Sequence, residues 1–396
     1  MQTNFSDSFL ATAKGQRIND IMRRCVHCGF CNASCPTHQV TGNELDGPRG
    51  RIYLIKEALE DQTVSSASLQ HLDSCLSCLN CETSCPSGVE YRELIDFGKK
   101  IILQRVPRRW WPKTLRNSLC FVLTRPRLLK PFYWLARQLK LTPNITQKPT
   151  YISTTKAKNP RYLILKGCVQ SVAAPSIAEK LQQLLDRADI SSQIDSYNHC
   201  CGAIEYHNDA ESKSLQRIKS NIDNWYTQIE NGCEAIIMTA SGCGAMIQDY
   251  PRLLIDDINY AEKAKIVAKH SLDAAEILSQ LPLRKSQSAL KNIVFHPPCT
   301  LQHAQQLDHH AEQILIRVGY QLQTFKDRHL CCGSAGTYSI LHSEMAKKLR
   351  QEKLEQLEAV PVELIASANI GCMLHLQKGT QTPVRHWLEL IEIDQS

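Results

Sequence analysis

The 396-residue sequence lacks any run of roughly 18 uncharged apolar residues, which is the length that a membrane-spanning helix requires. Its N-terminal segment also lacks the apolar core and small-residue cleavage site of a secretory signal. An apolar fraction of 43% and a charged fraction of 21% exclude a mainly disordered or fibrous protein. We therefore expect two or three globular domains, in the cytosol or on a membrane face that is open to it.

Motifs for organic redox cofactors are also missing. The chain contains no G-x-G-x-x-G turn, no G-x-x-x-x-G-K-[ST] loop and no G-x-S-x-G elbow. We therefore expect no flavin, nicotinamide or nucleotide on this chain, and no catalytic acid or base among its residues. Any substrate oxidation that needs such a cofactor would therefore take place on a partner chain.

Acidic residues are absent from residues 97–178, which contain 17 basic residues although the whole chain has a net charge of only +7. The segment also holds Trp110, Trp111 and Trp134, and its pattern predicts two amphipathic helices over 110–125 and 131–141. Basic, tryptophan-bearing helices are typical of peripheral binding to anionic lipid. Docking on an acidic partner and a plain connector are the alternatives. Nucleic acid is not expected, because no recognition motif accompanies the charge.

Cysteine is abundant, with 18 residues. Cytosolic thiols stay reduced, so clustered cysteines there indicate metal binding or redox chemistry rather than disulfides. Cys120 and Cys233 stand alone and fit the role of small buried apolar residues. The others gather in groups that require another explanation.

Two short polar runs hold eight of these cysteines with the spacing C-x2-C-x2-C-x3-C-P. This is the bacterial ferredoxin spacing, in which three thiolates bind one [4Fe–4S] cluster and the fourth ligates the cluster of the other run. We therefore predict a first cluster on Cys25, Cys28, Cys31 and Cys85, and a second on Cys75, Cys78, Cys81 and Cys35. Zinc is the alternative, but it normally takes two C-x2-C pairs with a longer spacer.

Helical patterns frame the two runs, one beginning at Arg51 and one over 89–103. They indicate the helical type of two-cluster ferredoxin domain. Arg49 and Arg51 beside the loop could raise a cluster potential, or they could be solvated residues at a helix start.

A second repeat fills the rest of the chain, in which apolar strands and helices alternate and cysteines follow the strands. The cysteines of its two copies are Cys168, Cys200, Cys201 and Cys243, and then Cys299, Cys331, Cys332 and Cys372. Corresponding cysteines lie 131 residues apart, or 129 for the last pair. Such self-similarity indicates duplicated α/β units with parallel strands, whose sites gather at the carboxyl ends of the strands.

The eight repeat cysteines could form one metal centre or two. A third iron–sulfur centre, zinc and no metal all remain open for them. His296 and His375 supply additional polar ligands in the second copy, whereas the first copy has Met246 in the position of His375.

Over its full length the chain resembles the iron–sulfur subunits of bacterial glycolate oxidases. The resemblance rests on RCVHCGFC at 24–31, DGPRGRIYL at 46–54, NCETSCPSG at 80–88, TASGCG at 239–244, CTLQHAQ at 299–305 and LCCGSAGTY at 330–338. Related subunits serve lactate oxidation and anaerobic glycerol-3-phosphate oxidation, which are the alternative functions.

The resemblance implies that flavin-binding subunits oxidise glycolate to glyoxylate and that this subunit passes electrons towards a membrane quinone. It also implies a peripheral location on the cytoplasmic side of the inner membrane. Relatives hold unusual clusters on their Cys-Cys-Gly repeats with a final C-x2-C pair. This chain departs from that pattern, because Met246 and His375 replace the last cysteine of each pair.

The expected fold class is α/β, with a helical two-cluster ferredoxin domain before a duplicated cysteine-rich domain. The expected boundaries are 1–104 for the ferredoxin domain, 105–158 for the basic connector, 159–285 for the first repeat and 286–396 for the second. A metal-stabilised module that binds nucleic acid through the basic segment is the alternative from another functional class.

Overall fold

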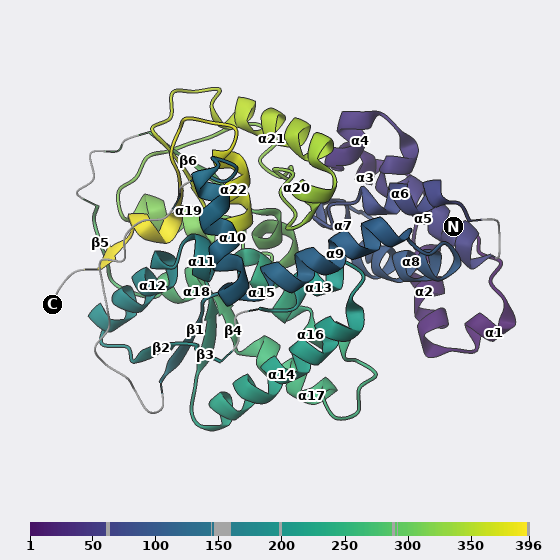
Figure 1. Ribbon diagram of the computed structural model, residues 1–396, viewed down its shortest axis with the longest axis horizontal. Coiled ribbons are helices and arrows are strands. Elements are labelled where there is room, and N and C mark those ends of the chain that lie inside the picture. The colour runs from purple at the N-terminus through teal and green to yellow at the C-terminus, as the bar shows by residue number, and fades with distance from the viewer. Residues whose placement is uncertain are drawn as a thin grey trace. The chain divides into compact units, whose positions relative to one another are not determined.

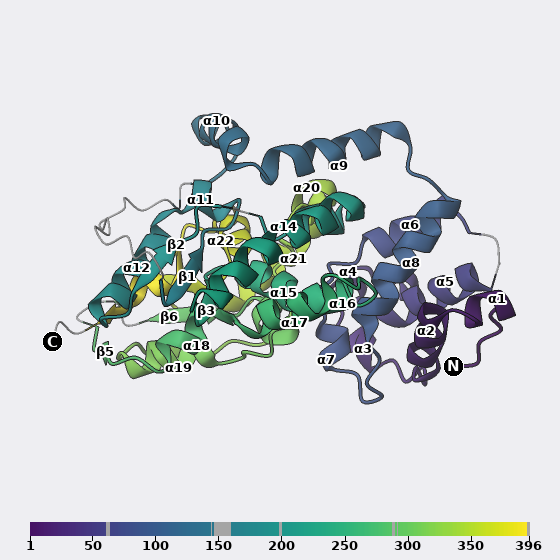
Figure 2. The ribbon, with the colours of Figure 1, turned by 90° about the horizontal axis from the view of Figure 1, so that it is seen from below.

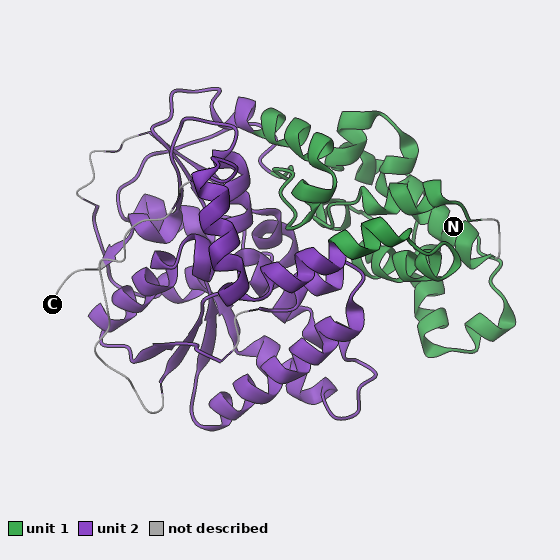
Figure 3. Ribbon diagram, in the orientation of Figure 1, with its two compact units in different colours: residues 1–115, 329–353 green, residues 116–328, 354–396 purple. Residues whose placement is uncertain are grey.

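The computed structural model describes residues 1–60, 64–143, 145, 160–197, 200–286, 290 and 292–393. They form two compact units (Figure 3): unit 1 contains residues 1–115 and 329–353, and unit 2 contains residues 116–328 and 354–396. The expected α/β fold class is confirmed (Figure 1). The end of the expected basic connector, at 144 and 146–158, lies outside the described residues.

Unit 1 is built from short helices around the two ferredoxin runs. These are α1 (Asp7–Leu10), α2 (Ala13–Arg23), α3 (Phe30–Ala33), α4 (Pro36–Thr41), η1 (Glu44–Asp46), α5 (Pro48–Leu59), α6 (Ser66–Asp73), α7 (Asn80–Thr83) and α8 (Tyr91–Arg105). The later segment adds α20 (Tyr338–Leu341) and the start of α21 (Ser343–Leu357). The helices predicted after Arg51 and over 89–103 are confirmed by α5 and α8.

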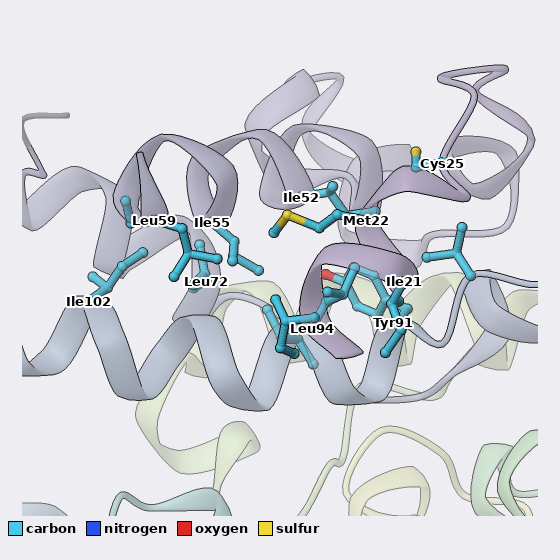
Figure 4. Packing of buried hydrophobic residues seen from close by; sticks show 14 of the residues in the cluster. Ile21, Met22, Cys25, Ile52, Ile55, Leu59, Leu72, Tyr91, Leu94 and Ile102 are labelled. Atoms are coloured by element: carbon cyan, nitrogen blue, oxygen red, sulfur yellow. The ribbon is translucent and has the colours of Figure 1, made fainter. Parts of the chain in front are cut away.

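The core of unit 1 lies between α5 and α8 (Figure 4). Ile52, Ile55, Leu94 and Ile102 are at most 3% exposed, and each such side chain contributes about 1.5–3 kcal/mol by leaving water. Gly98 permits the close approach, because a Cβ atom there would lie 2.3 Å from Cγ1 of Ile55. This packing holds both cysteine runs against one small core.

Unit 2 contains two parallel four-stranded sheets with the same strand order. The first has the order β2 (Ser192–Ile194), β1 (Tyr162–Leu165), β3 (Ala235–Met238), β4 (Ser271–Asp273). The second has the order β7 (Leu322–Gln323), β6 (Ile293–His296), β8 (Leu364–Ser367), β9 (Val384–His386). In each sheet the two central strands are almost fully buried, as their continuous apolar runs predict. The shared order confirms the duplication.

Helices cover these sheets. In the first copy they are α11 (Gln170–Ala173), α12 (Ser176–Arg187), α13 (Ala203–His207), α14 (Glu211–Glu230), α15 (Ser241–Gln248), α16 (Tyr250–Leu253), α17 (Ala261–Lys269) and α18 (Ala274–Leu278). In the second they are the π-helix η2 (Thr300–Ala304), α19 (His310–Arg317), α22 (Ile370–Gln377) and the 3-10 helix η3 (Trp387–Leu390). A short antiparallel pair, β5 (Leu283–Arg284) with β10 (Glu392–Ile393), joins the last residues to the segment between the copies.

The basic segment forms α9 (Trp110–Leu123) and α10 (Pro126–Gln138). The predicted second helix, 131–141, was placed too late. Pro126 stands in the first turn of α10, where its missing N–H costs nothing, and the helix continues through Pro131. No described helix is long and apolar enough to cross a bilayer.

Candidate metal centres

The first cavity of unit 1 brings together cysteines from both ferredoxin runs. Cys25, Cys28 and Cys31 of the first run and Cys85 of the second line it, together with Cys81 at its inner end. Burial, together with the neighbouring Cys25, Cys85 and Cys28, raises the pKa of the Cys31 thiol to about 11. These are the four residues predicted for the first cluster.

In the second cavity the second run contributes three cysteines and the first run contributes one. Cys75, Cys78 and Cys81 line it from the second run and Cys35 lines it from the first. Burial raises the pKa of Cys81 well above its ordinary value, and Cys78, Cys75 and Cys35 act in the same direction. The geometry is therefore crossed as the motif predicts, although the ligands themselves stay a prediction.

The two loops share an unusual backbone. His27 and Ser77, at equivalent positions, have φ angles of 55° and 50°, and Gly29 and Leu79 have 83° and 63°. A left-handed conformation costs a residue other than glycine about 1–2 kcal/mol, so these loops are held by what surrounds them. This conformation lets three cysteines spaced two residues apart face one point.

The donor set fits iron–sulfur clusters. Each cavity offers at least four sulfur atoms, Cys81 lining both, and at neutral pH a half-buried thiol such as Cys31, with a pKa of about 11, would keep its proton without a bound cation. A metal centre stabilises several thiolates at once, and four thiolates suit a [4Fe–4S] cluster. Zinc also accepts four thiolates, so the donor set alone does not exclude it.

The second cavity has a buried cation at its wall. Arg51 is 1% exposed and therefore is not a solvated residue at a helix start. Its guanidinium donates to the carbonyl of His71 at 2.8 Å, to Oγ of Ser74 at 2.7 Å and to Oγ1 of Thr37 at 3.0 Å. Its Nη1 lies 3.8 Å from Sγ of Cys35.

Arg51 and Cys75 stabilise each other's charged forms. Burial lowers the pKa of Arg51, but negative charge on Cys75, Tyr91 and Cys35 outweighs this and raises it above its ordinary value. Burial likewise raises the pKa of Cys75, but the Arg51 cation outweighs this and the pKa falls below its ordinary value. The hydroxyl of Tyr91 adds a donor 3.9 Å from Sγ of Cys75.

Several of these partners were not found from the sequence. Thr37, Ser74 and Tyr91 carry no motif signal, and Tyr338, whose hydroxyl donates to the carbonyl of Ser74 at 3.1 Å, is distant in the chain. Only the position of Thr37 directly after Pro36 could have suggested a role.

The first cavity is more open than the second. Cys28 is exposed, and the neighbouring Val26 and Phe30 are each 66% exposed. Arg49 approaches this cavity but pairs with Glu44 at 2.6 Å, so its charge is largely compensated. The second cavity is lined by the buried Arg51, and the two centres therefore differ in both exposure and local charge.

The first copy of the repeat gathers its four cysteines within unit 2. Cys168 follows β1, Cys200 and Cys201 precede α13, and Cys243 lies in the first turn of α15 after β3. The thiols form two hydrogen-bonded pairs, Cys168 with Cys200 and Cys201 with Cys243. Sites at the carboxyl ends of parallel strands are what this fold favours.

The hydrogen bond within each pair is the largest influence on the pKa of its thiols. The bond to Cys200 raises the pKa of Cys168, and burial adds to the effect. The bond to Cys243 lowers the pKa of Cys201 although burial opposes it. Three buried sulfur donors and the half-buried Cys243 fit a four-thiolate metal centre, either iron–sulfur or zinc.

The backbone of this site is fixed by buried polar contacts. Gly202 has a φ of 93°, and its N–H donates to Sγ of Cys200 at 3.5 Å. The hydroxyl of Tyr250 donates to the carbonyl of Cys201 at 2.7 Å, and Nδ2 of Asn221 donates to that of Cys200 at 3.0 Å.

Two residues that precede Cys243, Thr239 and Ser241, are also bonded to the second copy. The Thr239 carbonyl lies 2.8 Å from Nε2 of His386, and the Ser241 N–H donates to the Ala368 carbonyl at 3.1 Å. Nε2 of Gln305 donates to the Ser241 carbonyl at 3.1 Å, and Oγ of Ser241 lies 2.8 Å from Oγ1 of Thr300. The two copies therefore share a buried polar contact within unit 2.

The cysteines of the second copy are divided between the units. In unit 2, Cys299 begins η2, and the buried Cys372 of α22 accepts from Nδ2 of Asn369 at 3.7 Å. In unit 1, Cys331 and Cys332 are buried, and Gly333 (φ 86°) donates to Sγ of Cys331 at 3.4 Å, as Gly202 does in the first copy. His296 ends β6 with its Nδ1 3.1 Å from Oγ of Ser367, and His375 is buried in α22.

Family comparisons agree with this division of the chain. Residues 21–89 match the 4Fe-4S dicluster domain, and residues 162–248 and 293–377 match the cysteine-rich CCG domain. The dicluster match spans all eight ferredoxin cysteines of unit 1 and supports iron–sulfur clusters on this chain. The two CCG matches coincide with the two copies of the repeat.

Curated relatives match over most of the chain. The glycolate oxidase iron-sulfur subunit of Escherichia coli is 43% identical, covering 99% of this chain and 98% of that protein. The probable glycolate oxidase iron-sulfur subunit of Bacillus subtilis is 26% identical, covering 90% and 88%. Lactate utilization protein A of Bacillus subtilis is 22% identical, covering 57% of this chain and 95% of that protein.

Proposed function

Because this chain belongs to the family of glycolate oxidase iron–sulfur subunits, we propose that it relays electrons from a flavin-binding partner that oxidises glycolate to glyoxylate towards a membrane quinone. The pair of four-cysteine cavities with crossed contributions is the observation that carries the proposal. Identity of 43% over almost the full length of both chains supports glycolate as the substrate of the complex.

The division of labour follows from the chemistry of each part. Oxidation of glycolate to glyoxylate releases two electrons and two protons, and a reduced flavin can hold both electrons. Each [4Fe–4S] cluster, when bound, takes up and releases one electron at a time. The residues of this chain would hold the clusters, place the buried Arg51 cation beside the second and place Cys28 of the first at the surface.

The order of transfer follows from the two environments. The exposed Val26 and Phe30 beside Cys28 suit contact with a redox partner, because electron exchange requires a close approach. With clusters bound, the Arg51 cation would favour reduction of the second centre, and the exposed first cavity would be the place where electrons from the flavin enter.

We further propose that the chain works at the cytoplasmic face of the inner membrane, where a quinone accepts the electrons. The segment 97–178, with 17 basic residues and no acidic one, supports contact with an anionic surface.

A substrate test decides between glycolate and the alternatives. Anaerobic complex would receive glycolate, lactate or glycerol-3-phosphate, and EPR would follow reduction of the clusters. We expect reduction by glycolate. Reduction by lactate but not by glycolate would contradict the proposal. It would favour a function in lactate oxidation, as the name of the more distant relative lactate utilization protein A indicates.

A second test separates relay from substrate oxidation. In a complex with Cys28→Ala and Cys78→Ala, the flavin subunits should still oxidise glycolate with a soluble dye as acceptor, while quinone reduction falls to background. Cys233→Ser, at a buried lone thiol, is the matched control and should leave both activities intact. If the double variant loses dye reduction and the Cys233→Ser control keeps it, this chain takes part in substrate oxidation.

We also propose a third metal centre on Cys168, Cys200, Cys201 and Cys243. The convergence of four thiols, three of them buried, in two hydrogen-bonded pairs supports it. A third iron–sulfur cluster and zinc are both compatible with four thiolates, and metal analysis distinguishes them.

A further inference from the structure

Helix α10 of unit 2 presents an apolar stripe to solvent. Phe132, Leu135 and Leu139 follow one another at intervals of three and four residues and are 59%, 49% and 60% exposed. Leu128 continues the same row one turn earlier and is half-buried. Residues at this spacing lie on one face of a helix, so the stripe is continuous.

The face of α10 that adjoins this stripe already has its partner. Leu129 is buried, Tyr133 and Ala136 are half-buried, and α10 packs on α11 of the same unit. Figure 2 shows α10 at the edge of unit 2. The stripe is therefore the part of the apolar surface of α10 that packing within unit 2 leaves exposed.

The segment around α10 also carries exposed cations. Arg127, Lys130 and Lys140 are exposed, and no acidic residue occurs anywhere in 97–178. Arg108 does not join them, because it forms an ion pair with Asp73 in unit 1.

A basic hollow lies at the C-terminal end of α10. Arg137, Lys140 and Lys378 line it, the last from just beyond α22, with Gln138 and Gln377 as polar neighbours. No carboxylate lines this hollow. Three cations around one open space suit the phosphate of a lipid headgroup, next to an apolar face that suits acyl chains.

We propose that α10 lies flat in the surface of an anionic phospholipid bilayer, with Phe132, Leu135 and Leu139 among the acyl chains and the surrounding lysine and arginine side chains on the headgroups. Charge complementarity decides for lipid over a second copy of this chain, because two copies would place like charges against one another. An acidic protein partner is the competing occupant.

Flotation on vesicles tests this proposal with the full-length, cluster-containing chain. We expect binding to vesicles of phosphatidylcholine with phosphatidylglycerol at a ratio of three to one. Binding should fall at least tenfold on pure phosphatidylcholine or in high salt, because each Lys or Arg near an anionic surface contributes roughly a fivefold change in partition.

Variants then locate the surface. The triple variant Phe132→Ser, Leu135→Ser, Leu139→Ser should lower partition at least tenfold, because it removes most of the buried apolar area. The matched control is Ile255→Ser, Ile258→Ser, Ile316→Ser, which alters three isoleucines of unit 2 that are 62%, 98% and 58% exposed. The control should float like the wild type. Unchanged visible absorbance and circular dichroism check that both variants are folded.

Two results would overturn the proposal. One is a wild-type protein that does not float on anionic vesicles, and the other is equal flotation of the two triple variants. If the α10 variant instead loses the flavin-binding partner and floats normally, the stripe is a protein interface. The assay contains no glycolate, so its outcome is independent of the proposed electron relay.

Discussion

Nη1 of Arg51 lies 3.8 Å from Sγ of Cys35, with both side chains buried in unit 1. The other hydrogen bonds of the guanidinium described above go to a carbonyl and two hydroxyl groups, so the thiolates of the second cavity supply negative charge opposite it. A buried cation at this distance stabilises the added electron of a bound cluster.

Replacing Arg51 by Gln should lower the midpoint potential of the second cluster. A unit charge at about 6 Å with an effective dielectric constant of about 20 is worth about 3 kcal/mol, or on the order of 100 mV for one electron. Redox titration followed by EPR measures the change. Arg49→Gln is the control, since Arg49 is paired with Glu44, and it should change this potential much less. An unchanged potential in Arg51→Gln would show that the cation does not tune the cluster.

Single-cysteine variants test the crossed ligation. If Cys85 belongs with Cys28, then Cys85→Ala and Cys28→Ala should lose the same cluster and leave the same residual EPR spectrum. Cys35→Ala and Cys78→Ala should leave the other spectrum. The opposite grouping, Cys85 with Cys78, would mean that each run binds its own cluster. Iron and sulfide analysis checks that one cluster remains in each variant.

Metal analysis tests the third centre. The wild type should contain about twelve irons per chain if the site holds a [4Fe–4S] cluster, or about eight irons and one zinc if it holds zinc. Cys201→Ser and Cys243→Ser should each remove that additional metal and leave the two unit 1 clusters. Cys233→Ser is the control and should keep all metal. Eight irons and no zinc in the wild type would contradict the centre.

Two buried carboxyl groups predict a pH dependence of stability. Burial raises the pKa of Asp273 to about 7 and that of Glu389 to about 7, whereas their ordinary values are 3.8 and 4.5. Between about pH 4.5 and 7 the folded chain therefore keeps protons that the unfolded chain has lost. Stability is greatest at the acidic end of this window and falls as the pH rises through it.

Asp273→Asn should remove part of this fall. Asn can still accept the N–H of Ala275, which Oδ1 of Asp273 accepts at 2.9 Å, but it cannot ionise. The difference in thermal midpoint between pH 5.5 and pH 8 should shrink by several degrees, about 2–4 °C for each kcal/mol. The exposed Asp256→Asn is the control and should keep the wild-type difference. An unchanged difference in Asp273→Asn would exclude this carboxyl as a cause.

Much of the architecture could be predicted because it depends on local patterns. The apolar runs that became β1, β3, β6 and β8 had to be buried, and burial on both faces favours parallel strands. The ferredoxin cysteines were recognisable because their spacing is dictated by the size of one cluster. The prediction of a helix over 131–141 is wrong at its start, because proline is common in the first turn of a helix and two prolines compete for that place. Pro126 occupies it, and Pro131 lies inside α10.

The surroundings of the sites could not be predicted, because they depend on residues that are distant in the sequence. Nothing in the residues adjacent to Arg51 shows that it is buried against Thr37 and Ser74. Residues 329–353 are likewise grouped with the N-terminal segment by packing. The repeat period could not predict this, because it assigns them to the second copy.

The bonds from Thr239 and Ser241 to the second copy have a consequence for the history of this chain. A fragment that ended before β6 would leave those backbone groups without partners directly before Cys243. The first copy of the duplicated domain has therefore come to depend on the second for these hydrogen-bond partners. Shortening or exchanging the second copy alone would disturb the backbone that positions Cys243.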